Sequence, residues 1–285
     1  MRNILLVIDN VAASESIVIK ALKVAVQCKA NLLLCDLVTS RVEEPVTVGH
    51  YDDDILVYEN EGATVEQLAE RLRTLRQTGS EFAPLIDCLA ANDFSQHTIK
   101  EIVVNHNVWL MILDEEQLIR LKDMEPNQPL HIINNINCPI LIMPNDFDAG
   151  YFNKISYVTD LRYCDLGVIK FLKVFNAQLF VTHISAPGLP DMDERYAQEI
   201  LAEEVSTKVN YWKIFLRNIK TGNVKASIHN VIDTVGIRML SLVNKKHQTF
   251  ERLFDHFPQN APIYHNLPTL IFPYLNWFNQ ASFYA

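Results

Sequence analysis

The stretch Asn3-Ile4-Leu5-Leu6-Val7-Ile8-Asp9 decides the fold, because a continuous apolar run of this length is typical of a strand buried on both faces of a sheet. It recurs later in the chain as Lys154-Ile155-Ser156-Tyr157-Val158-Thr159-Asp160. Three further matches keep the same order, namely Ile19–Val24 with Ile169–Val174, Ala30–Leu34 with Ala177–Val181, and Cys138–Pro144 with Leu267–Pro273. Four collinear matches indicate duplication of one domain of roughly 140 residues, a common size for a single core.

The composition supports two folded domains, for which we expect the boundaries 1–148 (half one) and 149–285 (half two). The chain has 285 residues, of which 49% are apolar and 21% charged, so each half has the material for a buried core. The first apolar run has only five residues before Asp9 ends it, too short for a signal peptide, and no run approaches the roughly 20 apolar residues of a membrane span. We therefore expect a cytoplasmic protein with no membrane partner.

The charge is divided unevenly between the halves. Half one has 11 basic and 23 acidic residues (−12), and half two has 14 and 11 (+3), which sum to the net charge of −9. Nucleic-acid binding requires cations that neutralise phosphates, so we expect no nucleic-acid partner. The five cysteines are scattered without a C-x-x-C pair, and no histidine spacing suits a metal, so we expect neither a metal site nor a cofactor.

Half one alternates strand and helix. The expected strands are 4–8, 32–38, 85–89, 108–113 and 140–143, and the expected helices are 14–28, 64–78 and 95–106. The helical spacing of Ile17, Ala21, Val24 and Cys28 predicts one buried face. Such alternation predicts βαβ units in an open, doubly wound, mainly parallel sheet.

Half two repeats this alternation with expected strands 155–158, 179–184, 224–229, 237–243 and 269–272. The apolar residues from Tyr196 to Ile219 predict one long second helix. Only seven residues separate His229 from Ile237, fewer than a parallel crossover normally needs, so we expect the third helix to be reduced and that face of the sheet thinner.

Two segments stand apart from this pattern. Residues 39–61 form a polar insertion that is more typical of a solvated loop than of a site. The tail after Pro273 contains Tyr274, Trp277, Phe278, Phe283 and Tyr284, too many aromatic side chains to leave in water. We expect this aromatic tail to dock on its own domain or on a partner.

The run Ile8-Asp9-Asn10-Val11-Ala12-Ala13-Ser14, with the ending Cys138-Pro139-Ile140-Leu141-Ile142-Met143-Pro144, resembles the universal stress protein family over nearly the whole chain. The duplicated layout is similar to the family's tandem members. The resemblance implies two tandem five-stranded α/β sheets of the adenine-nucleotide α-hydrolase-like type. It also implies, for nucleotide-binding members, ATP at the carboxyl edge of the sheet, with the strand-1 aspartate near base and ribose and a G-x2-G-x9-G-[ST] loop around the phosphates.

That phosphate loop is missing from both halves. Half one has no glycine between Gly79 and Gly150, and half two has none after Gly236. Without glycine the backbone N–H groups cannot turn toward phosphate oxygens in the conformations that the loop requires. Half one places Asp114-Glu115-Glu116 there instead, and these carboxylates would repel a triphosphate. We therefore expect no nucleotide in half one.

Half two offers the better candidate for an anion site. Lys245, Lys246 and His247 follow its fourth strand, and Asp160 and His183 are expected at the ends of its first two strands. Ligands of open α/β sheets bind at this carboxyl edge. A solvated basic turn is the more common meaning of such a charge run.

We expect a non-catalytic stress-response or signalling protein that binds a partner or a small ligand. No catalytic motif is present, so we expect no enzyme activity. The resemblance implies that the last strands of the two halves pair in an internal pseudo-dimer, with Ile140, Ile142, Leu270 and Ile271 at the interface. We also expect a homodimer and an unknown protein partner. Two alternatives stay open: a nucleotide-binding protein or slow ATPase that uses the basic turn, and a carrier of an apolar ligand that uses the thinner face.

Overall fold

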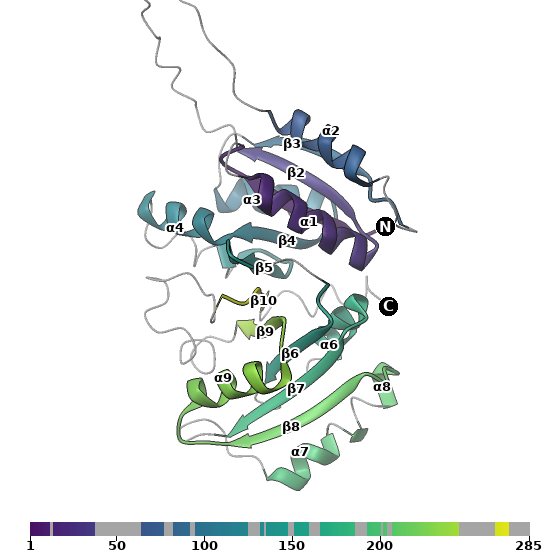
Figure 1. Ribbon diagram of the computed structural model, residues 1–285, viewed down its shortest axis with the longest axis vertical. Helices are drawn as coiled ribbons and strands as arrows, with labels where there is room; N and C mark the ends of the chain where they lie inside the picture. Colours follow the sequence, from purple (N-terminus) through teal and green to yellow (C-terminus); the bar gives the residue numbers. More distant parts are fainter. Residues whose placement is uncertain are drawn as a thin grey trace, which may run out of the picture.

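The computed structural model shows an elongated α/β molecule in which half one lies above half two (Figure 1). It describes residues 1–11, 14–37, 64–76, 82–91, 95–124, 132–133, 135–147, 151–159, 166–185, 193–200, 202–203, 207–244 and 266–273. The polar insertion, the aromatic tail and the basic turn all lie outside these residues.

Half one alternates strands and helices as predicted. Its strands are β1 (Asn3–Ile8), β2 (Asn31–Leu37), β3 (Ile86–Ala91), β4 (Val108–Asp114) and β5 (Ile140–Met143), and its helices are α1 (Glu15–Cys28), α2 (Val65–Arg76), α3 (Gln96–Asn105) and α4 (Glu115–Met124). The predicted inner face of α1 is buried at Ile17, Ala21, Val24 and Cys28. The alternating α/β prediction is therefore confirmed for this half.

In its described residues, half two contains the same number of strands as half one. They are β6 (Lys154–Thr159), β7 (Gln178–Ser185), β8 (Ile214–Lys220), β9 (Met239–Asn244) and β10 (Thr269–Pro273). Between them lie α6 (Leu166–Leu172), the 3-10 turn η1 (Lys173–Phe175), α7 (Glu194–Ile200), α8 (Thr207–Val209) and α9 (Val224–Val235).

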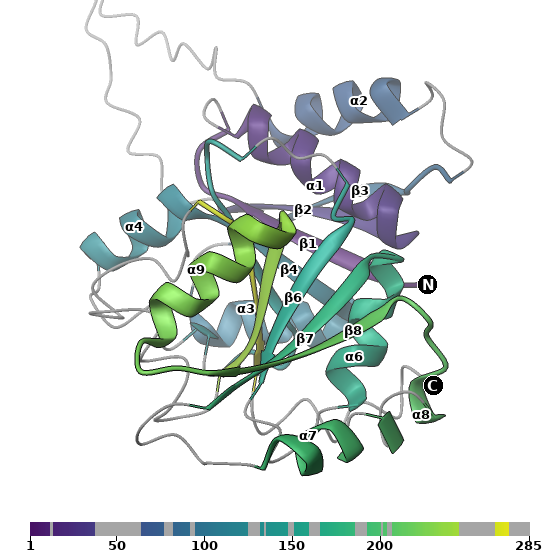
Figure 2. The same ribbon diagram turned by 60° about the horizontal axis from the view of Figure 1, so that its bottom comes forward.

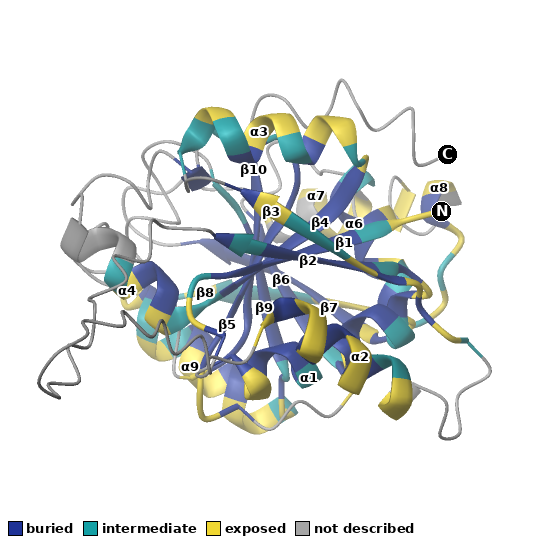
Figure 3. Cartoon of the chain, turned by 90° about the horizontal axis from the view of Figure 1, so that it is seen from above, coloured by how far each residue is buried: buried dark blue, intermediate teal, exposed yellow. Residues whose placement is uncertain are grey.

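The ten strands in the described residues form one sheet, in the order β3-β2-β1-β4-β5-β10-β9-β6-β7-β8. Neighbours run parallel except β5 and β10, which pair antiparallel with Leu141 opposite Leu270. The strand order of half one is thus repeated outward from the centre in half two. Helices lie on both sides of the sheet, with α3 on one side and α1 and α2 on the other, and the strands between them are mostly buried (Figures 2 and 3).

Two predictions for half two are wrong. Residues 224–229 begin helix α9 and are not a strand, and the third strand is β8, within the stretch predicted as one long helix. Caps at both ends define α9: the Asn223 side chain accepts a hydrogen bond from the Ala226 N–H (3.1 Å), and Gly236 adopts a φ of 69°. The crossover helix is therefore present, and the thinner face proposed for an apolar-ligand carrier does not exist.

The segment after β4 contains a helix that was not predicted. Asp114-Glu115-Glu116 follows the strand as expected, and helix α4 begins at Glu115, immediately after β4. Both acidic residues of its first turn suit the positive end of a helix. The segment that follows β4 is therefore the first turn of a helix.

Aromatic side chains fill the junction between the halves. Trp109 of β4 stacks on Phe171 of α6 with ring centroids 4.0 Å apart, and Phe272 of β10 meets Phe171 edge-on at 5.1 Å. All three side chains are buried. The halves consequently share one apolar core across the β5–β10 pair.

Across the described residues, no helix is long and apolar enough to cross a membrane.

Candidate functional site

The candidate site is the carboxyl edge of half one, where β1, β4 and β5 end next to one another. In the strand order of half one, β1 lies between β2 and β4, so the direction of winding reverses between β1 and β4. Ligands of open α/β sheets bind at such a switch point. The residues that follow these strands, and the helices that begin beside them, decide whether a ligand fits.

Asp9 follows β1 and is bound by Arg120 of α4. Arg120 donates from Nε to Oδ2 of Asp9 and from Nη2 to Oδ1, both at 2.8 Å. The Asp9 side chain is 19% exposed and that of Arg120 40% exposed. This two-bond geometry is the strong form of an arginine–carboxylate pair. The hydrogen bonding of Arg120 to the Asp9 carboxylate raises the pKa of Arg120 above its usual value, so the guanidinium stays charged.

Glu116 extends the pair into a network. Arg120 Nη1 lies 3.4 Å from Glu116 Oε2, and the other Glu116 oxygen accepts a 2.5 Å hydrogen bond from Asn145 Nδ2. Asn145 belongs to the loop that follows β5. The network therefore ties the end of β1, helix α4 and the end of β5 to one another.

A buried lysine holds the same loop from the other side. Lys20 of α1 is only 7% exposed, and its Nζ donates to the carbonyls of Pro144 (3.1 Å) and Asn145 (2.6 Å). A buried ammonium requires such oxygen partners. The loop after β5 is thus anchored to α1 as well as to α4.

Gln117 packs the start of α4 against β1. Its side chain is 1% exposed, and Nε2 donates to the Val7 carbonyl at 3.4 Å. Within the described part of the chain its Oε1 has no hydrogen-bond partner. The first turn of α4 therefore packs directly against the end of β1 through Gln117.

The edge is electrostatically unsuited to a phosphate. Burial raises the pKa of Asp114 and of Glu115 above their usual values, and neighbouring carboxylates add to both effects. A group whose own negative charge is already disfavoured would be disfavoured further by a phosphate nearby. Arg120 and Lys20, the cations beside these carboxylates, are already bound to protein oxygens.

Of the residues predicted for the half-two site, the structure describes His183. Asp160, Lys245, Lys246 and His247 lie outside the described residues. His183 is at the end of β7 as expected, but it is completely buried, with Nδ1 3.3 Å from the Thr159 carbonyl and Nε2 3.2 Å from Ser185 Oγ. Both ring nitrogens lie within hydrogen-bonding distance of buried protein oxygens, and the side chain has no surface in contact with solvent.

The four predicted interface residues, in contrast, lie next to one another. Ile140 is opposite Ile271, Ile142 is opposite Thr269, and Leu270 is opposite Leu141 between them. All are buried. Pairing of β5 with β10 leaves neither of these strands with a free edge.

Sequence reasoning missed Arg120 and helix α4. A signal was present, because Glu116 and Arg120 have the i, i+4 spacing of a helical ion pair and Asp114 precedes them as a potential cap. The Asp9–Arg120 pair itself spans 111 positions in the sequence, which no local pattern reveals.

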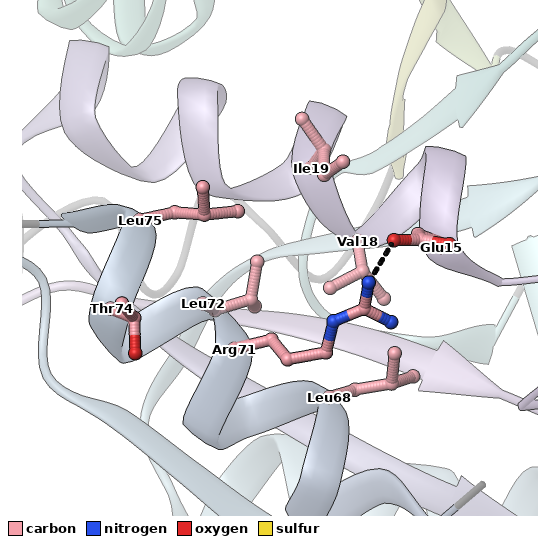
Figure 4. Close-up of a pocket in the computed structure, with 8 residues that line it drawn as sticks. All are labelled: Glu15, Val18, Ile19, Leu68, Arg71, Leu72, Thr74 and Leu75. Carbon is pink, nitrogen blue, oxygen red and sulfur yellow. Dashed lines mark ion pairs between the residues drawn. The ribbon is translucent and has the colours of Figure 1, made fainter.

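A hollow lies between α1 and α2, away from the residues of the half-one edge. It has a volume of about 450 Å³ and is lined mainly by aliphatic side chains, with Leu75 52% exposed at its rim. Arg71 of α2 reaches across to Glu15 of α1 at 3.0 Å (Figure 4). Both charged side chains are more than half exposed, so this pair contributes little energy and marks no site by itself.

Comparison with known proteins gives structures but no sequence relative. No protein-family model matches the chain, and no curated protein matches it. A universal stress protein structure from Archaeoglobus fulgidus DSM 4304 is 12% identical, with a TM-score of 0.59 over 95% of this chain and 96% of that one.

Two further solved structures have the same arrangement. One is a putative universal stress protein from Pseudomonas aeruginosa UCBPP-PA14 (12% identity, TM-score 0.56, 100% of this chain and 98% of that one). The other is the cytoplasmic domain of a prokaryotic cation chloride cotransporter (9% identity, TM-score 0.53, 95% and 94%). The strand order, the helices on both sides of the sheet and these likenesses together show the universal stress protein fold.

Proposed function

We propose that this chain is a non-catalytic stress-response or signalling protein of the universal stress protein type, which acts by binding a protein partner and not by binding ATP in half one. The observation that carries the proposal is the pair between Asp9 and Arg120. In the nucleotide-binding members of the family that the sequence resembles, the strand-1 aspartate lies near the base and ribose. In this chain a guanidinium from α4 occupies both oxygens of that aspartate.

Displacing Arg120 would be costly. A ligand that took its place would have to break two short charge-assisted hydrogen bonds, each worth about 1.5–3 kcal/mol. It would also leave Arg120 beside Asp114 and Glu116 without its main partner. We therefore infer that the carboxyl edge of half one is closed to ATP and has a structural role. The function would then depend on surfaces that bind a protein partner.

Titration of the full-length protein with MgATP tests the proposal. At physiological ionic strength, where the exposed charges of the basic turn in half two are screened, we expect no saturable heat in a calorimeter up to millimolar ATP and no phosphate release above the buffer rate. Arg120→Ala is the informative variant, because it uncovers Asp9 while the carboxylates of α4 remain; we expect it not to bind ATP either.

The controls separate the two halves. Micromolar ATP binding that Asp9→Ala abolishes would overturn the proposal. Binding that is unaffected by Asp9→Ala but lost in Lys245→Ala/Lys246→Ala would instead place a nucleotide at the basic turn of half two, the alternative function.

A further inference from the structure

Strand β8 forms one end of the ten-stranded sheet. In the part of the chain that the structure describes, β7 is the strand that pairs with it, and nothing pairs with its outer side. The strand lies at the opposite end of the sheet from half one (Figure 1). Free sheet edges are templates for pairing with another chain.

The hydrogen bonds between β7 and β8 show which backbone groups are free. The Lys213 carbonyl accepts from the Leu179 N–H (2.8 Å), and the Thr221 N–H donates to the Ser185 carbonyl (2.9 Å). Because backbone groups alternate along a strand, the odd-numbered residues between them also face β7. The N–H and C=O groups of the even-numbered residues, including Leu216, therefore point outward.

Large apolar side chains flank these outward groups. Phe215 is 43% exposed and Leu216 38% exposed, and Trp212, just before the strand, is 86% exposed. The opposite edge strand, β3, differs, because its exposed side chains are Asp87 and Ala90. β8 has seven residues without proline or glycine, one more than β3, so its backbone can pair along its whole length.

The charge around β8 identifies the occupant. From Glu204 to Asp233 the intervening sequence contains five basic residues and no acidic one, although the whole chain carries −9. Within this span Arg217 lies over the Phe180 ring at 5.8 Å, Lys213 lies beside Trp212, and Lys220 is exposed at the end of the strand. A second copy of β8 would bring like charges together, which destabilises strand pairs. An acidic strand would find opposite charges along the whole edge.

We infer that β8 is a docking edge for an extended, acidic segment of a partner protein, which adds to the sheet as a further strand. Backbone bonds to the even-numbered residues supply affinity. Leu216 receives the alternate apolar side chains of the segment on one face of the sheet, and Arg217, whose side chain leaves the opposite face, selects its carboxylates. The inference deepens the proposed partner-binding function and rests on it. It involves no residue of the half-one edge, so the ATP titration and the peptide titration below can fail independently.

The probe is a fluorescein-labelled peptide of sequence Glu-Val-Glu-Ile-Glu-Val-Asp-Ile-Glu, titrated with full-length protein and followed by fluorescence anisotropy. We expect saturable binding with a Kd on the order of 10 μM at low salt, weakened by added salt because the charges are exposed. A peptide with lysine at every acidic position should not bind.

Leu216→Pro and Leu216→Ala form the decisive pair. Proline removes the outward N–H and no bond to β7, and proline is tolerated in edge strands, whereas alanine keeps that N–H and removes only the side chain. We expect about a tenfold or larger loss of affinity for Leu216→Pro and less than about threefold for Leu216→Ala. Equal effects of the two substitutions would overturn the inference.

Two further measurements cover the remaining outcomes. If circular dichroism shows that Leu216→Pro does not fold, the double variant Arg217→Glu/Lys220→Glu replaces it. We expect this double variant to lose at least about tenfold in affinity for the peptide. Unchanged affinity would count against the inference. In the wild type, peptide should slow amide hydrogen exchange at Leu216 and Asn218. A ten-nucleotide oligouridylate that binds more tightly than the peptide would show a nucleic-acid surface and overturn the assignment.

Discussion

The side chain of Gln27 in α1 exchanges two hydrogen bonds with the backbone of Phe152, so a helix of half one holds the entry to half two. Gln27 Nε2 donates to the Phe152 carbonyl and the Phe152 N–H donates to Gln27 Oε1, both at 3.0 Å. Nε2 also donates to the Phe175 carbonyl at 2.8 Å. One amide thus satisfies three backbone groups beside the aromatic junction.

Gln27→Ala should destabilise the whole molecule, because it leaves these backbone groups without their partner. We expect a loss of about 1–3 kcal/mol in the free energy of unfolding by urea. Lys23→Ala, an exposed position on the same helix, is the matched control and should change stability by less than about 0.5 kcal/mol. Equal effects of the two substitutions would show that Gln27 does not couple the halves.

Trp109→Ala should be more damaging still. Trp109 is 2% exposed and stacks on Phe171, so its removal opens a cavity between the halves, at a cost of about 3–5 kcal/mol. Trp109→Phe preserves an aromatic ring and should cost clearly less. Trp212→Ala provides the control, because that side chain is 86% exposed and its loss should be nearly neutral. A Trp109→Ala protein as stable as Trp212→Ala would contradict the shared core.

The strands of half one were predictable because their signals are local and strong. Runs such as Ile4–Ile8 are apolar at every position, as a strand covered by helices on both sides must be. The inner face of α1 follows from residue spacing alone. In α2, spacing alone is less informative, because Leu68 and Leu72 are buried whereas Leu75, which continues the same helical spacing, is half exposed beside the hollow next to α1.

The exchange of strand and helix in half two has a physical explanation. Val224, Ala226 and Ile228 alternate like a strand over a short window, but Val224, Ile228, Val231 and Ile232 have helical spacing and are the residues that α9 buries. The Asn223 and Gly236 caps settle the choice. Arg120 could not be placed in the same way, because its partner Asp9 is brought to it only by the complete half-one sheet.

Asp114→Asn should stabilise the protein at neutral pH. Burial raises the pKa of Asp114 above its usual 3.8, so the ionised carboxylate disfavours the folded state. The stability associated with its protonated form is fully present below pH 3.8 and is lost as the pH rises through the higher folded-state pKa. The asparagine variant avoids this loss and keeps the oxygen that accepts the Glu116 N–H.

The gain at pH 7 should be less than about 1 kcal/mol, because Asp114 is partly exposed and solvent screens its interactions. Thermal unfolding from pH 3 to pH 7 measures it, and the difference between variant and wild type should shrink as the pH falls. Asp87→Asn, exposed on β3, is the control. A variant less stable than wild type at pH 7 would show that Asp114 is held by attractions stronger than its burial penalty.

We still predict that an anion binds at Lys245, Lys246 and His247, which directly follow β9. Half two has a net charge of +3, so it does not repel an anion as half one, at −12, would. The site lacks glycine-turned backbone donors, so affinity should be modest and should fall steeply with salt, exposed charges being screened over about 8 Å at physiological ionic strength. We expect a phosphate-bearing ligand such as ADP to bind the full-length protein at low salt and Lys245→Ala/Lys246→Ala to abolish binding.

The control is Lys220→Ala/Lys225→Ala, which removes the same charge elsewhere in half two and should bind ADP normally. If both double variants lose affinity equally, ADP responds only to the overall charge of half two; if neither does, the turn is a solvated surface.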